Sequence, residues 1–170
     1  MLLSDIWGKT NSEWLHYYIE NLAPHFEIHF YDVCELAEID RTKFTSEEVH
    51  QKFIEDGISS AVDRILEKEI EEVILVGFSI GGLIAWKASL SGLKTRHLFA
   101  ISSTRLRYED EKPKCKINLL YGERDKFAPD NQWLQKVEIE PEIYSNSEHE
   151  FYREKPVATH ICGQILKAVL

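Results

Sequence analysis

Three residues of the sequence have the types and the chain order that nucleophilic catalysis requires. Ser79 stands in the pattern Gly77-Phe78-Ser79-Ile80-Gly81, directly after the apolar run Val73-Ile74-Leu75-Val76. A serine hydroxyl is a weak nucleophile unless a base takes its proton and an acid orients that base. The pattern Gly-x-Ser-x-Gly between a buried strand and a helix forms a sharp turn that raises the serine side chain above a sheet. The sequence therefore predicts an activated hydroxyl at residue 79.

The glycines of this turn are expected to have a steric role. A sharply turned backbone at Ser79 leaves no room for a β-carbon at Gly77 or Gly81. The helix that follows would direct its N-terminal dipole and the Ile80 amide at an oxyanion formed on the serine. A simple strand-to-helix turn and a phosphate-binding loop are the alternatives. A phosphate loop would require a lysine that the sequence lacks here.

The acid is expected in a loop after a later strand. Asp125 ends the segment Leu120-Tyr121-Gly122-Glu123-Arg124-Asp125, in which Gly122 can turn the chain out of a strand. Asp130 and Glu123 are the alternatives. Asp130 is expected to be an N-terminal charge on a helix beginning at Pro129, and Glu123 is closer to the strand.

The base is expected to be His149. It lies in the polar loop Ser145-Asn146-Ser147-Glu148-His149, between the last predicted strand and the final helix. This position gives the chain order serine, acid, histidine. The other histidines fall within predicted helices or in and beside predicted strands, where a surface or core role is the simpler interpretation; they are His16, His25, His29, His50, His97 and His160. No metal site is predicted, because no Cys, Asp or Glu completes a ligand set with His25 and His29.

Composition limits the class of protein. The 170 residues have a net charge of −9 and are 44% hydrophobic, which favours one globular domain over residues 1–170. The negative charge disfavours nucleic acid and anionic membranes as partners. Three cysteines without close spacing and a start without a signal peptide favour the cytoplasm. No charge-free run is long enough to span a bilayer.

Predicted strands and helices alternate along the chain, which indicates a parallel sheet with helices on both faces. A capping box formed by Thr45 and Glu48 is expected to begin a helix, and an irregular acidic loop is expected at Asp32–Lys43. The predicted strands are Leu2–Ile6, Phe26–Tyr31, Val73–Val76, His97–Ile101, Ile117–Tyr121 and Glu140–Tyr144. The main predicted helices are Asn11–Leu22, Leu83–Leu90 and one opened by Pro156.

These motifs together resemble the α/β-hydrolase family. The resemblance covers nearly the whole chain, from Trp7-Gly8 after the first strand to Glu154-Lys155-Pro156 after His149. It implies Ser79 as nucleophile, His149 as general base and then acid, and Asp125 as the residue that holds the imidazole tautomer. It also implies an oxyanion hole made by the backbone amides of Ile80 and Trp7.

The sequence also departs from the family pattern. Family members usually have His-Gly where this chain has Asp5-Ile6. The stretch from Ser102 to Lys116 leaves no space for the helical cap that commonly covers the site. We therefore expect a minimal α/β-hydrolase fold of about six mostly parallel strands, with no cap domain and an open pocket.

The resemblance implies a serine esterase or thioesterase. A weaker similarity points to pimeloyl-acyl-carrier-protein methyl ester esterases. The substrate would then be a small ester or thioester, either free or linked to a carrier protein or CoA. A basic stretch between residues 105 and 116 could dock such an acidic partner, although a solvated linker is the simpler interpretation. No cofactor is implied. A non-catalytic binding protein and an acyltransferase or perhydrolase using the same triad are the alternatives.

Overall fold

A six-stranded sheet forms the centre of the molecule. The computed structural model describes residues 1–170. The strands are β1 (Leu2–Leu3), β2 (Phe30–Tyr31), β3 (Val73–Phe78), β4 (Thr95–Ile101), β5 (Lys116–Gly122) and β6 (Glu142–Tyr144). Their spatial order is β2-β1-β3-β4-β5-β6, and all neighbouring pairs are parallel. The carboxyl ends of all six strands therefore meet at one edge of the sheet.

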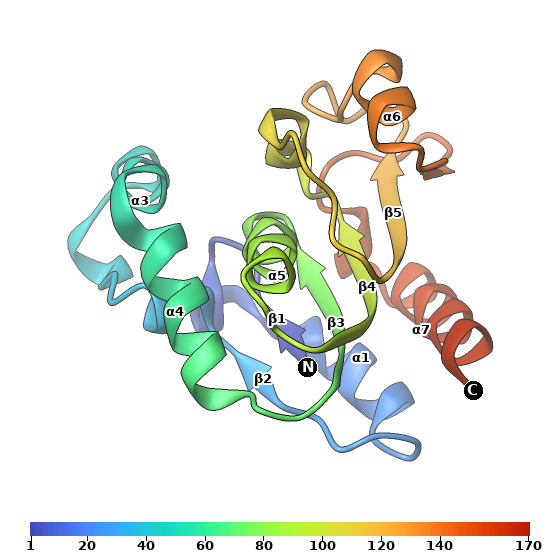
Figure 1. Ribbon diagram of the computed structural model, residues 1–170, viewed down its shortest axis with the longest axis horizontal. Coiled ribbons are helices and arrows are strands. Elements are labelled where there is room, and N and C mark those ends of the chain that lie inside the picture. The colour runs from blue at the N-terminus through green and yellow to red at the C-terminus, as the bar shows by residue number, and fades with distance from the viewer.

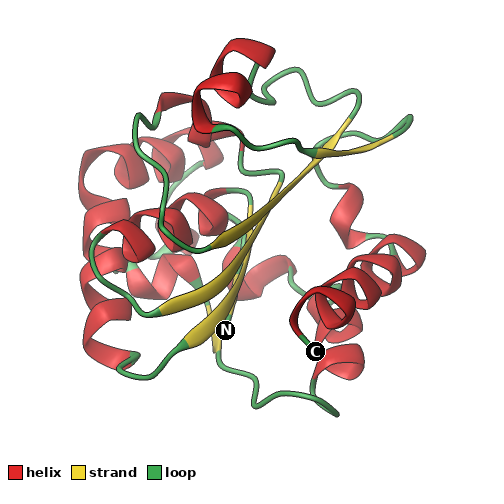
Figure 2. Ribbon diagram, turned by 45° about the vertical axis from the view of Figure 1, so that its right-hand side comes forward, coloured by secondary structure: helices red, strands yellow, loops and turns green.

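Helices cover both faces of this sheet (Figure 1, Figure 2). The α-helices are α1 (Leu15–Leu22), α2 (Val33–Leu36), α3 (Ser46–Lys52), α4 (Ile58–Lys68), α5 (Ile80–Leu90), α6 (Asn131–Val137) and α7 (Lys155–Val169). A π-helical turn, η3 (Phe53–Gly57), joins α3 to α4. Short 3-10 helices are η1 (Gly8–Asn11), η2 (Arg41–Lys43), η4 (Thr104–Tyr108) and η5 (Phe151–Arg153).

The core has two parts, one on each face of the sheet. Successive residues of β4 alternate between them: Leu98 and Ala100 pack with α4 and α5, whereas Phe99 and Ile101 pack with α1 and α7. This alternation follows from the two-residue period of a strand. Both faces are therefore apolar, which explains why the central strands are continuous hydrophobic runs.

The predicted fold class is confirmed, and some element boundaries are corrected. The capping box is present, because Thr45 Oγ1 accepts from the Glu48 N–H and the Glu48 carboxylate accepts from the Thr45 N–H. The segment expected to be an irregular loop contains α2, because the Asp32 carboxylate accepts hydrogen bonds from Cys34 N at 2.7 Å and Glu35 N at 3.3 Å. The first two strands are shorter than expected, with two residues each.

No cap covers the carboxyl edge of the sheet. Residues 102–115 join β4 to β5 directly and contain only η4. None of the helices is long and apolar enough to cross a membrane.

Candidate active site

Ser79 lies in a strained turn between β3 and α5. Its φ is 51° and its ψ is −116°, a combination that L-residues rarely adopt. The Ser79 N–H donates to Ile101 O of β4 at 2.8 Å. A β-carbon on Gly77 would lie 2.5 Å from Gly82 Cα, and one on Gly81 would meet backbone oxygens of Leu3 and Ser4. The predicted steric reason for both glycines is thus present in the structure.

His149 connects Ser79 to Asp125. Its Nε2 lies 3.0 Å from Ser79 Oγ, and its Nδ1 lies 2.6 Å from Asp125 Oδ2. A carboxylate only accepts hydrogen bonds, so Nδ1 carries the proton and Nε2 is left to accept the serine O–H. The structure therefore brings together the three side chains that the sequence singled out. The Asp125 side chain is 1% exposed and that of His149 is 35% exposed, so the hydrogen-bonded set runs from the interior to the surface.

The loop after β5 holds the Asp125 side chain. Its Oδ1 accepts from the Phe127 N–H at 3.1 Å, and the Asp125 N–H donates to Gly122 O at 3.1 Å. Its oxygens are thus committed to one backbone amide and one imidazole.

The two alternative acids have other contacts. Glu123 accepts from Asn146 N at 2.7 Å. Asp130 is the N-cap of α6 and accepts from Trp133 N at 2.9 Å. The helix begins at Asn131, two residues after the expected start at Pro129.

The loop after β6 holds His149. Ser102 Oγ donates to His149 O at 2.6 Å, and Ser102 itself is fully buried with a φ of 51°. The Arg124 N–H donates to Ser147 O at 2.9 Å. Gly122 permits this approach, because a β-carbon there would meet the backbone oxygens of Ser147 and Glu148. The backbone around the imidazole is thus fixed by the segments that follow β4 and β5.

The two predicted oxyanion amides differ in their surroundings. Ile80 is the first residue of α5, where an N–H has no acceptor within its own helix. The Trp7 N–H donates to Asp5 Oδ1 at 3.0 Å. The Ile80 N–H is therefore without an intrahelical acceptor, whereas the Trp7 N–H is hydrogen-bonded to a carboxylate.

Asp5 is the centre of a buried polar cluster. Besides the Trp7 amide, it accepts from Tyr152 Oη at 2.8 Å and from Arg153 Nη2 at 2.6 Å. Burial, and then the charge of Asp5, raises the pKa of Tyr152 well above its usual value, so its hydroxyl stays a donor. Arg153 also pairs with Glu150 at 3.1 Å. The cluster joins the loop after β1 to the segment that follows His149.

The side chain of Trp7 is held from two sides. Its Nε1–H donates to Glu150 Oε1 at 3.2 Å, and the Arg41 guanidinium lies 4.3 Å from its ring centroid. The next residue, Gly8, has a φ of 55° and leaves no space for a β-carbon beside the Asp32 carboxylate. The shape of this loop thus depends on contacts with Asp32 before α2, Arg41 of η2 and Glu150 before η5.

The other histidines have separate partners. His97 Nε2 lies 2.7 Å from Asn118 Oδ1, and burial lowers the pKa of His97. His29 Nδ1 lies 2.7 Å from Glu69 Oε1, and this hydrogen bond raises the pKa of His29. No group of three or more His, Cys, Asp or Glu side chains is arranged to hold a metal ion.

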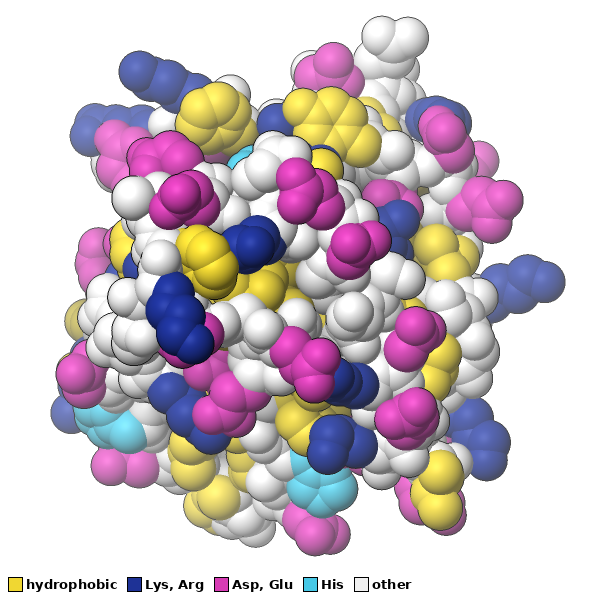
Figure 3. All heavy atoms as spheres, turned by 90° about the vertical axis from the view of Figure 1, so that its left-hand side faces the viewer, with side chains coloured by type: hydrophobic (Ala, Val, Ile, Leu, Met, Phe, Trp, Pro, Cys, Tyr) yellow, Lys and Arg dark blue, Asp and Glu magenta, His cyan; other side chains and the backbone are white.

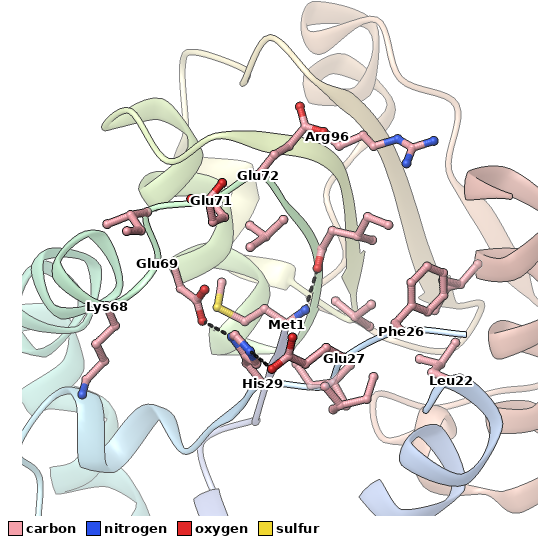
Figure 4. Close-up of a pocket in the computed structure, with 17 residues that line it drawn as sticks. Met1, Leu22, Phe26, Glu27, His29, Lys68, Glu69, Glu71, Glu72 and Arg96 are labelled. Carbon is pink, nitrogen blue, oxygen red and sulfur yellow. Dashed lines mark hydrogen bonds and ion pairs between the residues drawn. The ribbon is translucent and has the colours of Figure 1, made fainter. Parts of the chain in front are cut away.

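A hollow of about 460 Å³ lies at the opposite edge of the sheet, where the strands begin (Figure 4). Two of its polar groups have partners: the Glu69 carboxylate accepts from Tyr31 Oη at 2.7 Å, and the Met1 ammonium donates to Ile74 O at 2.8 Å. Burial lowers the pKa of that ammonium to about 6. The hollow contains none of the predicted site residues.

Two of the basic residues in the stretch after β4 form hydrogen bonds within the chain. Arg107 donates to Thr104 O at 2.8 Å and to Phe127 O at 3.0 Å. Lys112 donates to Val137 O at 2.6 Å. These two side chains are therefore engaged with carbonyl oxygens of the chain itself.

Sequence reasoning missed two groups of residues around the site. The first group is the cluster around Asp5. Almost the whole chain separates Asp5 from Tyr152 and Arg153, and no local spacing connects them. The one available signal was Asp5 itself, which stands where family members usually have histidine. Ser102 was also missed, because its role depends on the distance between β4 and the loop of His149.

Comparisons with known proteins agree with this architecture. Pimeloyl-[acyl-carrier protein] methyl ester esterases of Yersinia pestis and Yersinia pseudotuberculosis are 28% identical over 126 residues, which cover 73% of this chain and 44% of theirs. The chain thus spans less than half the length of the curated relatives it matches.

Among solved structures, the fold is similar to that of an α/β serine hydrolase without lid from Xanthomonas campestris, with a TM-score of 0.62, 15% identity and coverage of 99% of this chain and 81% of that one. It is also similar to α/β hydrolase domain-containing protein 10 from mouse, with a TM-score of 0.67, 14% identity and coverage of 99% and 88%. The sequence model of the dienelactone hydrolase family matches residues 22–162, a span that includes the serine turn and both of its partners. The chain therefore belongs to the dienelactone hydrolase family and has the fold of the α/β hydrolases.

Proposed function

We propose that the chain is a serine hydrolase that cleaves a carboxylic ester or thioester through an acyl-enzyme on Ser79. One observation supports this most directly: the continuous hydrogen-bond chain Ser79 Oγ, His149, Asp125, with distances of 3.0 Å and 2.6 Å. A protein that only binds a ligand has no physical need for this combination. The strained backbone conformation of Ser79 adds to the argument, because residues in such conformations cluster at active sites.

The proposed reaction has two halves. Ser79 Oγ attacks the acyl carbon while His149 Nε2 takes its proton, and the tetrahedral intermediate collapses with loss of the alcohol or thiol, which receives that proton. Water then attacks the acyl-serine and gives a proton to His149. The carboxylic acid leaves, and Ser79 Oγ takes that proton back from His149. Asp125 stabilises the imidazolium in both halves without becoming protonated.

The negative charge on the intermediate needs donors that are already in place. We assign the Ile80 N–H, supported by the N-terminal end of the α5 dipole, as the first donor. We assign the Trp7 N–H as the second, and it must share or leave its present bond to Asp5 Oδ1. Loss of one such donor typically costs about 10²–10³ in turnover.

The substrate class follows from the reaction and from similarity. A small acyl ester or thioester fits an edge of the sheet that no cap covers, and the curated relatives are named as esterases of a carrier-linked methyl ester. A panel of aryl esters, alkyl esters and acyl thioesters, free and carrier-linked, tests this. We expect turnover that Ser79→Ala abolishes while the unfolding temperature stays unchanged. Wild-type protein that is folded yet inert on every ester and thioester would contradict the proposal.

A second candidate is a non-catalytic binding protein with this fold. The observation that favours it is the engaged Trp7 amide, because a carboxylate beside the oxyanion position competes for the donor and repels the developing charge. The two candidates differ in one measurable way. A binding protein would not form a covalent acyl-serine with an activated ester, whereas the hydrolase would form one at Ser79.

A further inference from the structure

A groove between α4 and α5 is not used by the proposed reaction. It has a volume of about 570 Å³, and its apolar lining comes from both helices and from η3: Phe53, Ile54, Ile58, Val62, Leu83 and Leu90. Figure 3 views the molecule from the α4 side and shows exposed hydrophobic side chains bordered by acidic and basic ones. Ile54 and Leu90 are 40% and 37% exposed, so part of this apolar surface faces water.

Arg105 of η4 lies in the lining of this groove and has no partner for its charge. It forms no hydrogen bond and no ion pair with the chain, and its Nε is buried without an acceptor. Its guanidinium lies 5.1 Å from the ring centroid of Tyr108, which also lines the groove. A half-buried cation that lacks an ion-pair partner and lies beside apolar surface is complementary to an anion with an apolar tail.

The other charged groups of the groove define where such an anion would lie. Glu109 is neutralised by Lys87 at 2.9 Å. Glu55 and Asp63 belong to the opposite wall, formed by η3 and α4. These two carboxylates repel an anion from that wall, so the anionic group would lie at Arg105 and the apolar tail over the helix surfaces.

The groove begins close to the serine turn. Leu83 is four residues after Ser79, which corresponds to a rise of about 6 Å along α5, and Leu83, Lys87 and Leu90 follow one face of that helix. η4 begins two residues after Ser102, which holds His149.

We propose that this groove is a binding site for an amphipathic carboxylate, a straight-chain fatty acid of medium length, with its carboxylate on Arg105 and its chain along the Leu83 face of α5. The carboxylate would accept charge-assisted hydrogen bonds from the guanidinium. A carboxylic acid with an apolar chain is also what the proposed hydrolysis would release; that link rests on the proposed function, whereas binding does not.

Calorimetric titration with octanoate, octanol and octylammonium tests the site. We expect octanoate to bind more tightly than octanol, and octylammonium to bind most weakly. Arg105→Gln should weaken octanoate binding by about tenfold or more, because it removes the charge-assisted bonds. Arg105→Lys should give an intermediate affinity, because it keeps the charge but loses the forked geometry.

Two control variants separate binding in this groove from general charge attraction and from the reaction at Ser79. Lys114→Gln removes an exposed cation from the same segment and should leave octanoate affinity within about twofold. Ser79→Ala should bind octanoate as wild type does, so binding can succeed even if the proposed reaction fails. Amide chemical shifts that move on titration should lie in α4, α5 and η4. Equal affinity for octanol and octanoate, or an Arg105→Gln affinity equal to wild type, would overturn the proposal.

Discussion

Replacement of glycine by alanine should have opposite effects on stability at Gly77, in the turn of Ser79, and at Gly163, in α7. At Gly77, an alanine methyl would lie 2.5 Å from Gly82 Cα and 2.6 Å from Gly81 O and Gly82 N. The closest contact is about 0.9 Å inside the 3.4 Å at which ordinary van der Waals contact begins, and all three atoms belong to the backbone. No side chain can move aside, so the backbone itself must shift.

The magnitude follows from this clash. Replacing glycine by alanine favours folding by about 0.4–1 kcal/mol through the unfolded chain where the native conformation permits it. Overpacking costs typically about 1–3 kcal/mol, and a clash with rigid backbone belongs at the upper end. We therefore expect Gly77→Ala to lower the free energy of unfolding by about 2 kcal/mol or more. A shift near 1 Å at Ser79 should also slow its reaction by about 10²-fold.

The matched control is Gly163→Ala in α7. Gly163 is exposed in the helix interior, and a β-carbon there has nothing within 4 Å. This variant should raise the free energy of unfolding by about 0.5–1 kcal/mol and leave the serine reaction unchanged. Urea unfolding measures the first quantity and the rate of labelling by a fluorophosphonate the second. A Gly77→Ala protein with wild-type stability and labelling rate would refute the steric argument.

Three further substitutions test other parts of the site and fold. Ser102→Ala removes the hydroxyl that holds the histidine loop and leaves a carbonyl without its donor; we expect a loss of about 1–3 kcal/mol by urea unfolding and slower labelling, and an unchanged labelling rate would show that this bond does not position the imidazole. Asp5→Asn removes the buried charge that pairs with the partly buried Arg153, which should cost about 3 kcal/mol, and thermal unfolding like that of wild type would contradict it. The hydrogen bond that His29 donates to Glu69 raises the pKa of His29 in the folded protein, so the stability that His29 contributes is fully present below its unfolded pKa and is lost as pH rises through the folded value. The stability difference between wild type and His29→Gln should therefore be larger at about pH 5.5 than at about pH 8.5, and a difference that does not change with pH would refute it.

The part of the site that the sequence predicted depends on local sterics and chain order. The turn could be predicted from Gly77, Ser79 and Gly81, because its geometry depends on residues that are close together in the sequence. Asp125 and His149 follow from the parallel topology, since loops after successive parallel strands meet at the same edge of the sheet. The three side chains meet as that reasoning expected.

The remainder depends on contacts between distant segments. Asp5 meets Arg153 across 148 positions of sequence, and no periodicity records such a pair. β1 and β2 are shorter than their apolar patterns predicted, because strand length is set by pairing with neighbours as well as by composition. The helix α2 had a signal that could have been used, because Asp32 is a favoured N-cap residue.

The central claim is that Ser79 is activated by His149. Mass spectrometry of the intact protein and its peptides after fluorophosphonate treatment tests it most directly. We expect one adduct, located on Ser79, absent from Ser79→Ala and formed far more slowly by His149→Ala. Folded wild-type protein that remains unlabelled, or that labels equally fast without the imidazole, would contradict the claim.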